Sequence, residues 1–75
     1  MITPDLLRRI GKAVYGGTWE SRIATELEMA ERRLRRMARG QLPIPDALRD
    51  DLARLMESHA DECRELIAEL NGGIP

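Results

Sequence analysis

Cysteine and histidine are scarce in this chain of 75 residues, which contains one of each. A single cysteine cannot form a disulfide within the chain, and a free thiol suits a reducing cytoplasm. No cluster of cysteine and histidine is present to hold a structural metal. A domain of this size buries only about 60% of the surface of its unfolded chain. We therefore expect a homodimer, in which a second copy supplies further burial.

Long apolar runs are also missing from the sequence. No run approaches the roughly 20 apolar residues that a membrane-spanning helix needs. Residues 1–10 lack a basic segment followed by an apolar one, which is the pattern of a secretion signal. We expect a cytoplasmic protein with no membrane partner.

Aromatic residues are limited to Tyr15 and Trp19, which stand on either side of Gly16 and Gly17. Their rings could stack on a nucleic-acid base or sugar, but a single large ring more commonly anchors the core of a small domain. We favour the second role for Trp19.

His59 and Cys63 stand four residues apart, so one helix could present both side chains to the same metal ion. They also fit an apolar helix face, where a thiol behaves as a small hydrophobe. We favour packing, and expect no metal, no cofactor and no small-molecule ligand.

Adjacent acidic residues such as Asp50 and Asp51 lack the apolar enclosure that acid–base catalysis needs, so we expect no enzyme activity.

The formal net charge of −1 hides a division between the two parts of the chain. Residues 1–42 carry nine basic and five acidic side chains, a net charge of +4, whereas residues 43–75 carry three basic and eight acidic ones, a net charge of −5. A basic first part suits contact with a polyanion, and an acidic second part suits solvent or another subunit. Chance variation of surface charge is the alternative.

Helix signals divide the first 40 residues into three helices. Thr3 and Pro4 predict a helix start, which should continue to about Tyr15 and stop at the glycine pair. A second helix, capped by Thr18, should continue to about Leu27. A third should run from about residue 30 to residue 39, where Gly40 is suited to a left-handed cap.

The last part of the sequence predicts one long helix. Prolines exclude a helix in residues 40–45, but residues 46–71 contain neither proline nor glycine. A helix of about 25 residues would be about 37 Å long, so its far half needs a partner. We expect the near half to complete the core through Leu48, Leu52 and Leu55, and the far half to form the dimer interface. The interface residues are Met56, His59, Cys63, Leu66, Ile67 and Leu70. Two shorter helices, with a break near residues 58–59, are the alternative.

Arginine is concentrated in the third helix, where it makes up five of the last eight residues of segment 20–39. On a wheel of about 100° per residue, four side chains face inward and the arginines face outward. The inward residues are Ala30, Leu34, Met37 and Ala38. The outward arc consists of Arg32, Arg35, Arg36 and Arg39, with Arg33 on one flank and Glu31 at the other edge. One face of a single sign favours a polyanionic partner.

Residues 3–57 resemble the small helix-turn-helix DNA-binding proteins of the phage Cro and repressor type (Xre-like), which include anti-CRISPR-associated repressors. The matching pattern is an aliphatic–alanine pair, hydrophobic residues before and in the turn, two on the third helix, and a trailing glycine with prolines. These residues are Ile23, Ala24, Leu27, Met29, Leu34, Met37 and Gly40. The sequence has Glu28 where the family's turn usually has glycine, Ala30 where it has a serine or threonine cap, and Glu20 where it often has a glutamine that contacts phosphate.

The resemblance implies an all-α fold of four to five helices and a homodimeric repressor that autoregulates a small phage or mobile-element operon. Residues 1–57 would form the DNA-binding domain, residues 58–71 the dimerisation extension and residues 72–75 a frayed tail. The partner would be double-stranded DNA with an inverted-repeat operator. The implied DNA-binding residues are Thr18, Ser21, Glu31, Arg32, Arg33, Arg35, Arg36, Arg39 and Gln41. The alternative function is a helical adaptor or antitoxin-like module, whose arginine helix would cover an acidic protein partner.

Overall fold

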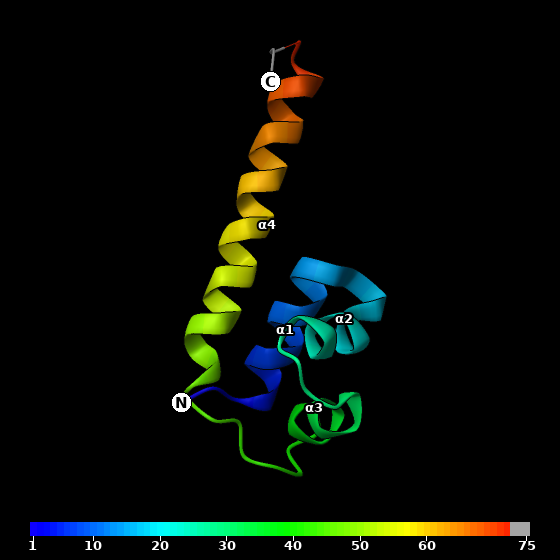
Figure 1. Cartoon of the computed structure of the whole chain (residues 1–75), viewed down its shortest axis with the longest axis vertical. Coiled ribbons are helices and arrows are strands. Elements are labelled where there is room, and N and C mark those ends of the chain that lie inside the picture. The colour runs from blue at the N-terminus through cyan, green and yellow to red at the C-terminus, as the bar shows by residue number, and fades with distance from the viewer. Residues whose placement is uncertain (73–75) are drawn as a thin grey trace.

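Residues 1–72, the part that the computed structural model describes, fold into helices without strands (Figure 1). The elements are α1 (Pro4–Tyr15), the 3-10 helix η1 (Gly16–Thr18), α2 (Trp19–Glu26), α3 (Glu31–Ala38) and α4 (Leu48–Leu70). The first three α-helices pack against one another, and α4 packs on α1 and then projects past them, so that the molecule measures 47 × 21 × 21 Å (Figure 1). The expected all-α class is confirmed. No helix of this part of the chain is both long and apolar enough to cross a membrane.

Local signals set the bounds of α1. The side chain of Thr3 accepts a hydrogen bond of 3.1 Å from the backbone N–H of Leu6, and Pro4 occupies the first turn, where a missing N–H is harmless. The helix stops at Gly16, whose φ of 69° favours glycine. The expected start and end of this helix are confirmed.

The turn between α2 and α3 is a Schellman motif built without glycine. The N–H of Met29 donates to the carbonyl of Ala24 at 2.9 Å, and the N–H of Glu28 donates to the carbonyl of Thr25 at 3.2 Å. Glu28 has a φ of 53°, the only positive value at a non-glycine residue in the described part of the chain. A side chain there costs about 1 kcal/mol, because its Cβ crowds the following carbonyl.

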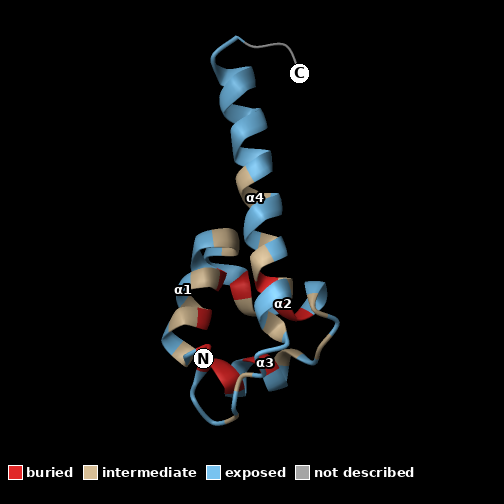
Figure 2. Cartoon of the chain, turned by 90° about the vertical axis from the view of Figure 1, so that its left-hand side faces the viewer, coloured by how far each residue is buried: buried red, intermediate tan, exposed pale blue. Residues whose placement is uncertain are grey.

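The core lies where α1, α2, α3 and the first half of α4 meet (Figure 2). Leu7, Ile23 and Leu34 are fully buried, and Trp19 is 6% exposed, which confirms its expected role as a core anchor. Ala30, which we expected to face inward, is exposed. It is the N-cap of α3, with extended backbone angles (φ −66°, ψ 133°), so its side chain does not follow the helical wheel.

The last helix, α4, is continuous, so the alternative break near residues 58–59 is wrong. It begins at Leu48, because residues 46 and 47 form a turn instead of the first helical residues. Its buried residue Leu52 contacts the core, whereas residues 61–70 are all exposed (Figure 2). The expected boundary between residues 57 and 58 therefore falls inside one helix. Gly72 (φ 79°) follows the end of α4, and the rest of the expected tail, residues 73–75, lies outside the described residues.

Candidate nucleic-acid interface

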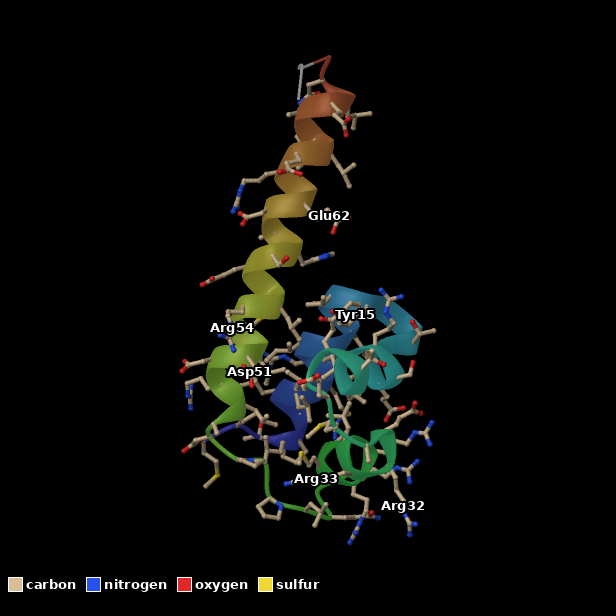
Figure 3. All side chains as sticks on the ribbon, in the orientation of Figure 1. Tyr15, Arg32, Arg33, Asp51, Arg54 and Glu62 are labelled. Carbon is tan, nitrogen blue, oxygen red and sulfur yellow. The ribbon has the colours of Figure 1, made fainter. Side chains whose placement is uncertain are left out.

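The exposed face of α3 is fixed by the residues that the helix buries. Leu34 and Met37 are 0% and 1% exposed, so the opposite side of the helix must face solvent. Arg32, Arg36 and Arg39 lie on that side, and all three are exposed. Figure 3 shows Arg32 pointing away from the other helices. Among residues 1–72, no carboxylate forms an ion pair with any of these three arginines.

Arg35 differs from its neighbours, because two carboxylates hold its side chain. Its Nε lies 3.9 Å from Oε1 of Glu20 in α2, and its guanidinium donates a hydrogen bond to Glu31 one turn earlier in α3. All three side chains are only partly exposed. The wheel placed Arg35 within the outward arc, but the structure places it at the edge of the arginine face that borders α2.

The expected cap of α2 by Thr18 is wrong. The side chain of Thr18 forms no capping hydrogen bond, because the 3-10 helix η1 leads directly into α2 and gives Thr18 turn-like backbone angles (φ −101°, ψ 20°). The N–H of Trp19 already donates to the carbonyl of Gly16. The hydroxyl of Ser21 also has a partner within the chain, because it donates a hydrogen bond to the Thr18 carbonyl at 3.2 Å.

The starts of α2 and α3 border a small open pocket of about 180 Å³. It brings together four of the residues that the sequence assigned to DNA, namely Thr18, Ser21, Glu31 and Arg35, and adds Glu20 and Gly17. Two carboxylates face one guanidinium here. This edge of the interface is therefore much less cationic than the exposed face of α3.

The end of α3 positions the remaining expected residues. Gly40 has a φ of 77° and donates its N–H to the carbonyl of Met37, which confirms the expected left-handed cap. The N–H of Gln41 donates to the carbonyl of Arg36 at 2.8 Å, so its backbone is fixed while its residue is exposed. Arg33 is exposed on the flank of α3 opposite Arg35.

Arg8 is a residue that sequence analysis missed. Its guanidinium donates a hydrogen bond to the backbone carbonyl of Ala38, 30 residues away, at the C-terminal end of α3. Helix C-termini carry partial negative charge and unpaired carbonyls, so an arginine there fixes the helix that carries the cationic face. No local pattern could reveal this contact, because it depends on how α1 and α3 pack.

The expected dimer residues lie along one side of α4. Met56, Leu66, Ile67 and Leu70 are 38%, 55%, 55% and 85% exposed, a large apolar exposure for a small chain. His59 and Cys63 lie between them, with Sγ of Cys63 3.8 Å from Nε2 of His59. Within residues 1–72, no group of three potential ligands is placed to hold a metal ion.

The charge of the α3 face remains positive after its internal ion pairs are counted. Residues 31–39 carry five arginines and one glutamate, a net charge of +4, and Glu20 reduces this to +3.

No family model, curated protein or solved structure matches the chain.

Proposed function

We propose that the protein is a homodimer that binds DNA sequence-specifically and represses transcription. The observation that carries the proposal is the exposed arginine face of α3, directly opposite the buried face that fixes the helix. A short helix with one buried and one cationic side, set after a tight turn, has the dimensions and charge to enter the major groove.

Arg32 and Arg36 are the best candidates for base contacts. Both lie near the centre of the outward face and have no carboxylate partner in the described part of the chain, so their guanidinium groups are available. Bidentate hydrogen bonds from arginine to O6 and N7 of guanine are the commonest specific contact, which favours an operator half-site with G·C pairs. Glu31 already accepts from Arg35 through Oε2, and its carboxylate has further capacity to accept from cytosine N4.

The residues around this centre suit the DNA backbone. Arg33 lies on one flank of α3, and Arg39 and Gln41 lie at its end, where a helix in the groove approaches phosphates. Ser21 and Thr18 lie at the start of α2, which crosses the backbone in helix-turn-helix complexes. Glu20 opposes phosphate binding at this point, so the α3 residues supply most of the attraction.

A homodimer would read an inverted repeat, because two-fold symmetry presents the same helix to each half-site. The centres of the half-sites would be about 34 to 36 Å apart, one turn of DNA. Repression follows from the resemblance to small phage and mobile-element repressors, which occupy promoters. We infer autoregulation of a small operon from the same resemblance.

Selection of bound duplexes from a random library tests the proposal most directly. We expect enrichment of one inverted repeat, and binding that weakens steeply as salt rises, because phosphate contacts release counterions. A matched control is the double variant Arg32→Ala, Arg36→Ala, which should retain salt-dependent binding but enrich no sequence. Absence of duplex binding at low salt would overturn the proposal and favour an interaction module with an acidic protein partner.

A further inference from the structure

An apolar groove lies between α1 and the first half of α4, and no residue of α3 lines it. It has a volume of about 580 Å³. Its walls include Leu6, Ile10 and Ala13 from α1 and Ala53 and Met56 from α4. Most of these side chains are only partly buried, so the groove is an unfilled apolar surface beside the core.

Most of the second half of α4, in contrast, has no surface of its own subunit to pack against. Residues 57–70, called the arm, lead away from the body of the molecule: residues 59 and 60 are half-buried, and residues 61–70 are all exposed (Figures 1 and 2). On a wheel of about 100° per residue, Cys63, Leu66, Ile67 and Leu70 fall on one side of the arm, in line with Met56 at the mouth of the groove. The apolar lining of the groove thus continues directly into the apolar side of the arm.

The charges of the groove and the arm are complementary. Arg9 and Arg49 line the groove, and their ion pairs with Asp5 at 3.5 Å and Asp46 at 3.8 Å are solvent-exposed, hence weak. The arm carries five acidic residues and one arginine, a net charge of −4. An acidic helix with an apolar side therefore suits this groove both in polarity and in sign.

We propose that the groove of each subunit receives the arm of a second copy of the chain, with the two α4 helices antiparallel. The groove wall on α4 centres on Leu52 and Ala53, and the apolar side of the arm centres on Leu66 and Ile67. A two-fold axis midway between them, near residues 59–60, fills both grooves at once, as a closed symmetric dimer requires. This inference rests on the homodimer of the proposed function and specifies its geometry.

The sole cysteine distinguishes this arrangement from a parallel coiled coil. In a parallel pair, the two Cys63 side chains face each other across the seam. In the antiparallel pair they are about seven residues apart along the axis, or about 10 Å. A disulfide requires Cα atoms within about 7 Å. Mild oxidation should therefore leave the native chain uncrosslinked. The double variant Ala60→Cys, Cys63→Ser should crosslink, because residue 60 lies beside the proposed axis.

A charge in the groove provides a second test. Ala13 is exposed on α1, so Ala13→Glu should fold normally, as circular dichroism can check. Glutamate there would face the acidic arm of the partner, and we expect the dimer dissociation constant to rise at least about tenfold. The control is Ala68→Glu on the outer side of the arm, which should change it less than about twofold.

Sedimentation of the wild type, Ala13→Glu and Ala68→Glu, together with the oxidation test, separates the possible failures. A wild-type chain that is monomeric at all concentrations would overturn the homodimer and this inference together. A wild-type dimer that crosslinks through Cys63, or that Ala13→Glu leaves intact, would overturn the groove as the docking site while the homodimer stands. A dimer weakened by Ala13→Glu alone, with crosslinking only through residue 60, is the expected result.

Discussion

Arg35 in α3 is paired with Glu20 in α2, with 3.9 Å between Nε of the guanidinium and Oε1 of the carboxylate. The same guanidinium also binds Glu31 in its own helix. Two neighbouring carboxylates thus engage one arginine at the edge of the cationic face. The pair links α2 to α3 only weakly, because both side chains are partly exposed to solvent, but it lowers the positive charge where α2 would approach a phosphate.

Replacing Glu20 with glutamine should therefore increase DNA affinity without regard to sequence. The change removes a negative charge from the interface and leaves Arg35 paired with Glu31 alone, so we expect affinity at low salt to rise about threefold to tenfold. Titrations of cognate and scrambled duplexes measure the effect. Glu26→Gln is the control, because Glu26 is exposed on the same helix and its replacement removes the same charge. Equal gains in both variants would show that only net charge matters.

Replacing Glu28 with glycine should stabilise the fold, since its φ of 53° is strained for any side chain. We expect the free energy of unfolding to rise by up to about 0.5 kcal/mol, which is the strain relieved less the added entropy of the unfolded chain. Urea unfolding measures it. Glu26→Gly, at the last helical residue of α2, should have the opposite sign. A loss of stability at both positions would mean that the turn is not strained.

Gly11 in α1 is required by the ring of Trp19. A Cβ added at Gly11 would overlap that ring, which is buried and cannot move aside. Gly11→Ala should lower the free energy of unfolding by about 1 to 3 kcal/mol, even though alanine is the better helix former. Gly17→Ala is the control, because no atom lies within 4 Å of its Cβ position. Thermal unfolding of both variants measures the difference, and an unaffected Gly11→Ala would contradict the close contact.

The sequence was sufficient to predict those features that depend only on neighbouring residues. The Thr3 cap and the Gly40 cap each arise within one helix end. It was misleading at Thr18, because a residue that caps most helices is bypassed when a 3-10 helix precedes it. Hydrophobic spacing also gave the buried side of α3 and the length of α4.

Contacts between helices could not be read from the sequence. The bond from Arg8 to the Ala38 carbonyl and the pairing of Arg35 with Glu20 depend on how each helix is rotated against its neighbour. Periodicity defines the inner face of a helix but not which neighbour covers each edge. The sequence therefore gave the members of the arginine face, whereas only the structure separates Arg35 from the other arginines.

The last prediction separates base contacts from phosphate contacts among these arginines. Arg36 lies near the centre of the exposed face of α3, so Arg36→Ala should cost about 1 to 3 kcal/mol on the cognate duplex and relax the preference at one base pair. Arg33 lies on the flank, where a helix inserted in the major groove would meet the DNA backbone. Arg33→Ala should weaken all duplexes alike and reduce the slope of log K against log salt by about one.

The measurement is a set of titrations of both variants with cognate and scrambled duplexes at several salt concentrations. Arg54→Ala, on α4, provides the control for removing a positive charge outside the interface, because Arg54 pairs with Asp51 there. It should leave both affinities nearly unchanged. If Arg36→Ala and Arg33→Ala reduce binding to the two duplexes equally, the face of α3 attracts DNA through charge alone, and the claim that it reads sequence must be withdrawn.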